Sequence, residues 1–102
     1  MQYQLVLQFA AGMISDYDAL IAIESRLITA LGEDAVDGHD MGSGEANIFL
    51  STSDPQKTFR QVTPLLERSG HMAAVTAAYR RTDEDLYHVL WPEGSQGQFS
   101  VA

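Results

Sequence analysis

The residues best suited to chemistry gather near the middle of the chain, where Asp37, His39, Asp40 and Glu45 follow closely on one another. If this stretch forms a strand, residues two apart share a face, so Asp37 and His39 are predicted to converge. A neutral imidazole beside carboxylates is a ligand set for zinc or manganese. The same pair can act as a general base with an orienting acid.

A metal site at this position lacks ligands. Only one histidine is local, so His71 or His88 would have to approach from distant parts of the sequence. The alternative is an exposed edge strand whose charges prevent pairing with the edge of another sheet. We therefore expect no metal and no cofactor, and we retain His39, Asp37 and Glu45 as candidate catalytic residues.

Two further polar features could carry a site. Glu24 falls on the apolar stripe of a predicted helix, where a carboxylate is costly unless it is paired, and Arg60 or Arg68 could be its partner. The alternative is a catalytic acid with a raised pKa. Gly42-Ser43-Gly44 could hold an anion with its backbone N–H groups, but it leads into a strand and has acidic neighbours, so a plain turn is predicted.

The elements that must position these residues are predicted from periodicity. Apolar residues alternate with a period of two, or recur at helical spacing, in successive segments of the chain. The predicted strands cover residues 3–9, 36–41, 46–51, 72–79 and 86–91, and the predicted helices cover residues 15–31 and the segment from Asp54 to Gly70. This order predicts one domain over residues 1–102, of the α+β class. It is the β-α-β-β-α-β antiparallel pattern of a ferredoxin-like two-layer sandwich, with an extra C-terminal strand.

Local signals mark the helix ends and the core. Ser15 is predicted to cap the first helix, and Asp54 the second. Pro64 is expected to kink or split the second helix, because it removes one helical hydrogen bond. The two apolar stripes predict a set of core residues, namely Leu20, Leu27, Leu31, Phe59 and Leu66.

The predicted sheet has one face without helices. If Leu5, Leu7 and Phe9 pack under the helices, then Val6 looks toward that other face. The side chains of Tyr79, Tyr87, Val89 and Trp91 could form an aromatic surface patch or belong to the core. The tail residues Phe99 and Val101 could instead cover the helix-free face.

Composition limits the classes of partner. Fourteen acidic residues against six basic ones give a formal net charge of −8. This charge argues against nucleic acid and anionic lipid, which require clustered Lys and Arg, and it permits steering toward a basic protein partner. The alternative is that the charge serves solubility alone.

The compartment is predicted to be the cytoplasm. The chain has no cysteine, which excludes disulfides and thiolate chemistry. We also find no apolar run that approaches the length of a membrane span and no signal-peptide pattern at Met1–Leu5.

The stretch Asp37–Phe49, together with Leu90-Trp91-Pro92, resembles a group of small bacterial proteins with a ferredoxin-like fold. The resemblance extends over nearly the whole chain and implies a bacterial source and that fold. It implies no activity and no functional residue.

These observations predict a non-catalytic, acidic protein-interaction or regulatory module that self-associates, as a dimer. The alternative is a small enzyme or ligand-binding domain that uses the helix-free sheet face, with His39 and neighbouring carboxylates as its polar groups. The enzyme reading requires His39 to lie in a concave site with a partner.

Overall fold

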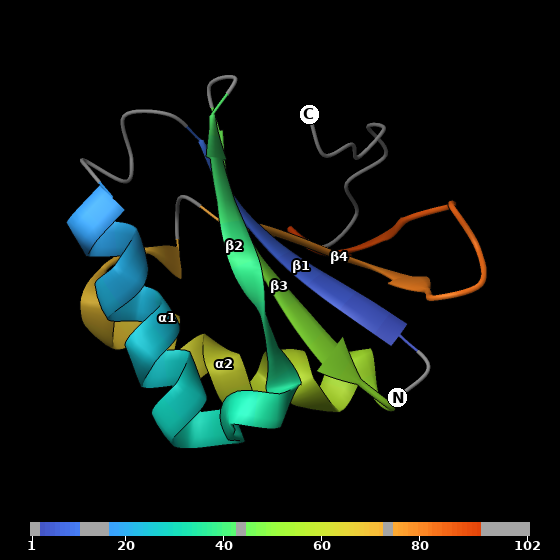
Figure 1. Cartoon of the computed structure of the whole chain (residues 1–102), viewed down its shortest axis with the longest axis horizontal. Helices are drawn as coiled ribbons and strands as arrows, with labels where there is room; N and C mark the ends of the chain where they lie inside the picture. Colours follow the sequence, from blue (N-terminus) through green and yellow to red (C-terminus); the bar gives the residue numbers. More distant parts are fainter. Residues whose placement is uncertain (1–2, 11–16, 43–44, 73–74, 93–102) are drawn as a thin grey trace.

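The computed structural model describes residues 3–10, 17–42, 45–72 and 75–92 (Figure 1). Its elements are β1 (Tyr3–Ala10), α1 (Tyr17–Leu31), a 3₁₀ turn η1 (Glu33–Ala35), β2 (Val36–Gly42), β3 (Glu45–Thr52), α2 (Pro55–Ser69), β4 (Val75–Arg81) and β5 (His88–Trp91). The α+β class is confirmed, with two helices and one antiparallel sheet of five strands in the described residues. The predicted cap Ser15 lies outside those residues.

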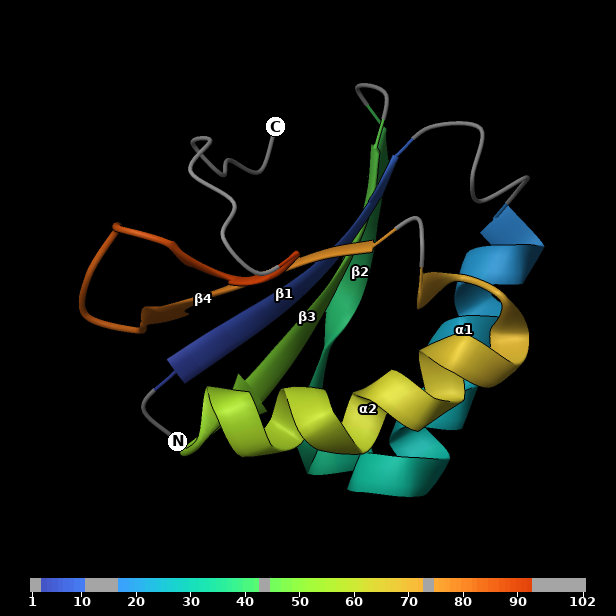
Figure 2. The ribbon, with the colours of Figure 1, turned by 180° about the vertical axis from the view of Figure 1, so that it is seen from behind.

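The strands are ordered β2-β3-β1-β4-β5, and every neighbouring pair is antiparallel. Helix α1 connects β1 to β2, and β3 lies between those two strands. Helix α2 connects β3 to β4, and β1 lies between them. Each β-α-β unit is therefore split by one antiparallel strand, which leaves β2 and β5 at the two edges of the sheet (Figure 2).

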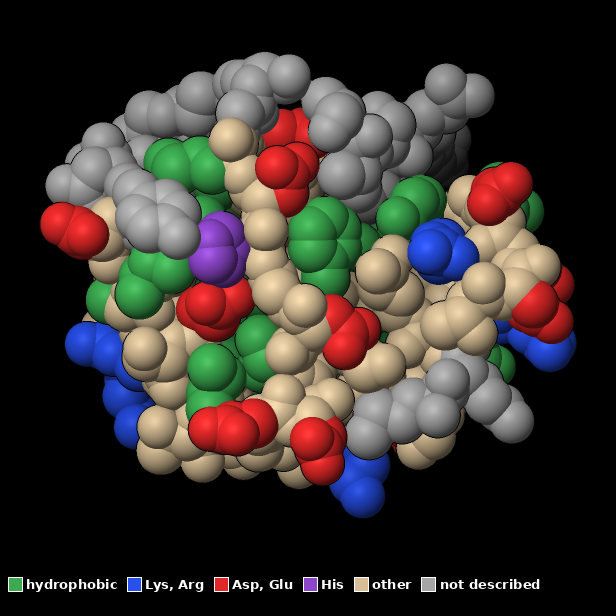
Figure 3. Space-filling model, viewed as in Figure 1, with side chains coloured by type: hydrophobic (Ala, Val, Ile, Leu, Met, Phe, Trp, Pro, Cys, Tyr) green, Lys and Arg blue, Asp and Glu red, His purple; other side chains and the backbone are tan. Residues whose placement is uncertain are grey.

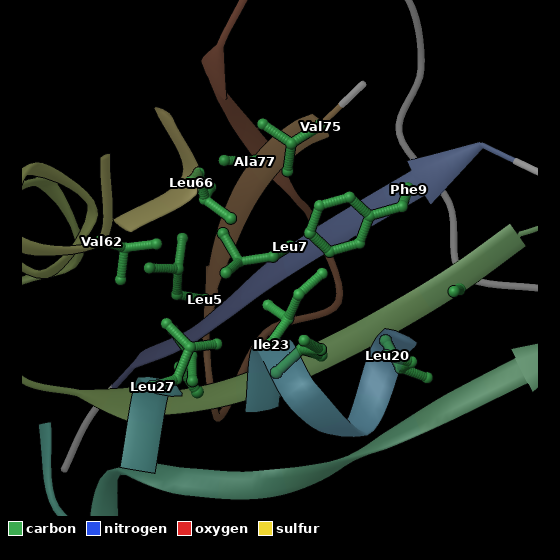
Figure 4. Close-up of a cluster of buried hydrophobic side chains, with 13 residues drawn as sticks. Leu5, Leu7, Phe9, Leu20, Ile23, Leu27, Val62, Leu66, Val75 and Ala77 are labelled. Carbon is green, nitrogen blue, oxygen red and sulfur yellow. The ribbon is translucent and has the colours of Figure 1, made fainter. Parts of the chain in front are cut away.

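Both helices pack on the same face of the sheet. Strand β1 contributes Leu5, Leu7 and Phe9 to a single buried cluster, because alternate side chains of a strand share a face. Figure 4 shows these side chains between the strands and the residues of both helices. The helix residues of the cluster are Leu20, Ile23 and Leu27 from α1 and Val62 and Leu66 from α2.

The predicted core is correct at three of its positions and shifted at the others. Leu20, Leu27 and Leu66 are fully buried. Leu31 and Phe59 are only partly buried and pack against the margin of the cluster. The buried stripe of α1 instead uses Ile23, three residues after Leu20 and four before Leu27, so the helix is rotated slightly from the orientation that the sequence predicted.

Helix α2 begins and ends at the signals found in the sequence. The Asp54 carboxylate accepts a hydrogen bond from the Lys57 backbone N–H at 3.1 Å, and Pro55 occupies the first turn. Gly70 ends the helix with a φ of 78°, a conformation that costs glycine little. The helix is not split at Pro64, since α2 is continuous from Pro55 to Ser69, and the alternative of a kink at Pro64 stays a prediction. Pro64 lies on the exposed side, where water can hydrogen-bond the carbonyl that it leaves unpaired.

Each edge strand contains a register shift. Val36 faces Leu50 while Gly38 faces Phe49, so Asp37 is an extra residue in β2. Gly38 has a φ of 137°, a backbone conformation that residues with a Cβ atom rarely adopt. In β5, Val89 faces Ala78 and Trp91 faces Ala77, so Leu90 is the extra residue. Such bulges change the direction of neighbouring side chains, and the one at Leu90 has consequences for the site described below.

Among the described residues, no helix is both long enough and apolar enough to cross a membrane.

Candidate functional site

His39 lies on β2 and is held by a carboxylate from α1. Its Nδ1 is 2.9 Å from Glu24 Oε2, so the imidazole N–H donates to the carboxylate. The two side chains are 23% and 14% exposed, respectively. In Figure 3, which has the view of Figure 1, a histidine side chain and an acidic side chain lie next to one another on this face of the molecule. The carboxylate on the apolar stripe is therefore paired, but with His39 and not with Arg60 or Arg68 as predicted.

The predicted cluster around His39 does not form, because its members point in different directions. His39 faces Ile48, on the side of the sheet that the helices cover. Asp40 is opposite Asn47 on the other side, and Asp37 is the exposed extra residue of the bulge. Glu45 Oε1 accepts a hydrogen bond from Asn47 Nδ2 at 3.4 Å. The prediction that Asp37 and His39 converge fails because the bulge interrupts the alternation between them.

The three histidines occupy three separate places. His71 Nδ1 lies 2.9 Å from Ser69 Oγ, and its ring packs edge-on against Phe9. The ring of His88 lies against that of Tyr79, with centroids 5.2 Å apart. In the ranges that the structure describes, no three His, Asp or Glu side chains come close enough to hold a metal ion.

Two predicted features fall beyond the described residues. Of the Gly42-Ser43-Gly44 turn, only Gly42 is described, as a residue of β2 paired with Glu45 across the hairpin. Ser43 and Gly44 lie outside the description, as do Phe99 and Val101 of the tail. The anion-binding alternative for the turn and the covering role of the tail stay predictions.

The helix-free face of the sheet carries an apolar row that crosses all five strands in register. Gly38, Phe49, Val6, Ala78 and Val89 follow one another from β2 to β5. Val6 and Ala78 have no exposed surface, whereas Phe49 and Val89 are half-buried. We call these five residues the cross-strand row.

On β1 and β3, the side chains that flank the row are polar and uncharged. Gln8 and Asn47 stand on one side of it, and Gln4 and Ser51 stand on the other. The amide of Gln8 donates to the Asn47 side-chain oxygen at 3.1 Å, which fixes both side chains against the sheet. These flanking side chains carry no charge, whereas Asp40 of β2, opposite Asn47, and Arg80 of β4, opposite Gln4, lie on the same face further from the centre.

The predicted aromatic patch divides between the two faces. Tyr87 lies over the helix-free face, where its hydroxyl is 3.3 Å from Gln4 Oε1 and Arg80 stands over its ring. Tyr79 and Trp91 pack on the other side, against the core beneath the helices. The bulge at Leu90 separates Trp91 from Val89, because the extra residue reverses the alternation expected over Tyr87, Val89 and Trp91.

The same bulge directs Leu90 and Trp91 toward α2, where a groove of about 490 Å³ opens between α2 and β5. Its floor is apolar and consists of Phe59, Met72, Leu90 and Trp91. Its rim is one polar stripe of α2, formed by Gln56, Arg60, Thr63 and Glu67. We call this feature the α2–β5 groove. Its size lies within the range of small-molecule sites.

The groove is not among the sites predicted from the sequence. The stripe of polar residues on α2 was visible at spacings of three and four, and it signals one exposed helix face. The adjacent pair Leu90-Trp91 was the other signal, since two large apolar neighbours break the strict alternation of an edge strand. Neither signal shows by itself that the two segments meet.

Comparison of the chain with protein-family models, with curated proteins and with solved structures finds no match. Three features of the described residues are candidate sites. They are the His39–Glu24 pair, the cross-strand row and the α2–β5 groove.

Proposed function

We propose that this domain is a non-catalytic, acidic protein-interaction module that self-associates as a dimer through the helix-free face of its sheet. We also assign it to the ferredoxin-like topology, with β5 as an added edge strand. The two split β-α-β units and the placement of both helices on one face support this assignment.

The observation that carries the proposal is the neutral cross-strand row on a strongly acidic molecule. Two copies that each carry a charge of −8 repel one another, so close contact is least costly where charges are absent. The row and its flanking residues Gln4, Gln8, Asn47 and Ser51 supply such a surface. Because Val6 and Ala78 are already buried, the area left for a second copy to cover belongs mainly to Phe49 and Val89.

A two-fold arrangement fits this surface, because the row and its polar flanks can face their own copies across the axis. The amide and hydroxyl groups of the flanking residues both donate and accept hydrogen bonds. Each can therefore bind the equivalent group of the second copy. The remaining acidic surface favours a basic protein as a further partner. The cytoplasmic location and the bacterial source expected from the sequence stay predictions.

Light scattering at rising protein concentration tests the dimer. The expected mass rises from 11.2 kDa toward twice that value, and added salt promotes the rise by screening the charge of the two copies. Phe49→Asp should hold the mass at that of one chain, because it places like charges near the axis. A wild-type mass of 11.2 kDa at every concentration and salt level contradicts the proposal.

Two further variants provide a second test of the interface and a control for net charge. Val89→Asp charges the end of the same row without touching a fully buried side chain, so it reports even if Phe49→Asp unfolds. Met41→Asp adds the same charge at an exposed apolar residue on the other side of the sheet and should leave the dimer intact. If Met41→Asp dissociates as readily as Val89→Asp, the dissociation results from the added net charge. That result would contradict an interface on the helix-free face.

A second candidate function is favoured by one observation, the 2.9 Å contact between His39 and Glu24. A carboxylate that orients an imidazole is the arrangement of a general base, so the domain would be a small enzyme. In this arrangement the carboxylate is that of Glu24 and not of Asp37 or Glu45. The pair also lies on the side of the sheet that the helices cover, whereas the sequence predicted the helix-free face. Hydrolysis of p-nitrophenyl acetate by the wild type, by His39→Ala and by the control His88→Ala is the test. Equal rates in all three proteins contradict the enzymatic alternative.

A further inference from the structure

The α2–β5 groove combines an aromatic floor with a cationic side chain on its rim. The rings of Phe59 and Trp91 lie with centroids 6.4 Å apart and planes tilted by 36°. Both side chains are half-buried, so part of each ring faces the groove rather than the core. An apolar ring placed against them would remove apolar surface of both partners from water, which is favourable.

Arg60 follows Phe59 directly in α2 and lines the same groove. Within the described residues its guanidinium forms no hydrogen bond or ion pair. The guanidinium presents planar paired donors that match the two oxygens of a carboxylate. The groove therefore offers an anion-binding group next to an aromatic floor.

Glu67 lies seven residues further along the same stripe. At a rise of about 1.5 Å per residue, its position is roughly 10 Å from that of Arg60 along the axis of α2. It also forms no side-chain ion pair in the part of the chain that the structure describes. A second negative charge on the far end of a ligand would meet this carboxylate and be repelled.

We propose that the α2–β5 groove is a binding site for a small aromatic monocarboxylate, whose ring lies on Phe59 and Trp91 and whose carboxylate pairs with Arg60. The groove volume of about 490 Å³ accommodates a ligand of one or two fused rings. This site lies on the helix side of the sheet, away from the cross-strand row, so it gives the interaction module a surface at which a small molecule can act on it.

The chain provides its own reporter, because Trp91 is the single tryptophan. Its indole N–H gives one signal in nitrogen–proton correlation spectra, and naphthoate is the probe to be titrated. The expected result is a saturable shift of that signal with a dissociation constant of about 0.1–1 mM, the range for a ligand of this size. Naphthamide, which has the same shape without the charge, should bind about fivefold to tenfold more weakly.

Two arginines on one helix give a matched pair of variants. Arg60→Gln should bind naphthoate and naphthamide equally, because the preference for the carboxylate arises at that guanidinium. Arg68→Gln removes the same charge from an exposed residue of α2 outside the groove and should keep the preference. Naphthalene dicarboxylate should bind more weakly than naphthoate to the wild type, and Glu67→Gln should remove that difference.

Three outcomes overturn the proposal. The first is the absence of a saturable shift at Trp91, and the second is a carboxylate preference that survives in Arg60→Gln. The third is a loss of self-association in Phe59→Ala by light scattering, which would assign the groove to a second copy of the chain. The test of the dimer at Phe49 and Val89 is read separately, so failure at the groove leaves the proposed function to its own experiment.

Discussion

His39 and Glu24 join β2 to α1 through a hydrogen bond of 2.9 Å at the boundary between the sheet and the helix layer. The two residues are fifteen positions apart in the sequence. The pair satisfies the polar groups of two half-buried side chains, and it connects an edge strand to the helix that covers it. The pair therefore contributes to the docking of α1 on the sheet.

The first prediction concerns the coupling between these two residues. A double-mutant cycle with Glu24→Gln and His39→Asn should give a coupling of about 0.5–1.5 kcal/mol in the free energy of unfolding, measured by chemical denaturation. Glu24→Gln removes the negative charge that the imidazole N–H faces, and His39→Asn removes the imidazole itself, so each single change weakens the contact and is destabilising. Asp40→Asn, at an exposed residue of the same strand, is the control and should change stability by less than about 0.5 kcal/mol. Additive effects of the two substitutions would show that the contact contributes nothing.

The second prediction distinguishes the centre of the core from its margin. Leu27 is fully buried, and Leu27→Ala should cost about 2–5 kcal/mol through lost burial and a residual cavity. Leu31→Ala, on the same helix but only partly buried, should cost clearly less. Equilibrium denaturation of both variants is the measurement. A loss below about 1 kcal/mol for Leu27→Ala would contradict its place at the centre.

The parts of the fold that were predictable from the sequence are those with local signals. The start and end of α2 follow from Asp54-Pro55 and Gly70, which act through hydrogen bonds and dihedral preferences within a few residues. The burial of Leu5, Leu7 and Phe9 follows from a period of two. These features need no knowledge of the tertiary structure.

The candidate sites required information that is not local. Glu24 and His39 were each singled out, but their pairing depends on how α1 docks against β2. The direction of Trp91 depends on the bulge at Leu90, which exists only in the pairing of β5 with β4. The alternation of residues along one strand does not reveal a β-bulge, because a bulge is defined by the pairing with the neighbouring strand.

The third prediction concerns the cap of α2. Asp54→Ala should lower the free energy of unfolding by about 1 kcal/mol, because the Lys57 backbone N–H loses its side-chain acceptor. Asp54→Ser keeps a capping oxygen and should recover most of the loss. Thermal and chemical denaturation provide the measurement. Equal destabilisation by both substitutions would mean that the charge of Asp54, rather than its hydrogen bond, carries the effect.

The fourth prediction concerns metal dependence. Treatment with EDTA should leave the melting temperature unchanged, because the chain has no cysteine and its three histidines lie in separate places. Folding of a protein around a structural metal would make stability depend strongly on the chelator. A clearly lower melting temperature after treatment, restored by added zinc or manganese, would contradict this expectation.

The last prediction tests the face on which Trp91 lies. As the only tryptophan, it gives the whole indole fluorescence of the chain. Its ring packs near Phe59 on the helix side, so Phe59→Ala should shift its emission to longer wavelength and increase its quenching by acrylamide. Phe49→Ala removes an equally large ring from the helix-free face and should leave the emission nearly unchanged. If the alternation over Tyr87, Val89 and Trp91 held without a bulge, Trp91 would share the face of Phe49 and the two variants would exchange their effects. Circular dichroism of both variants separates a local change around the indole from unfolding. A shift in Phe49→Ala alone, with the fold intact, would contradict the bulge at Leu90 and the α2–β5 groove that depends on it.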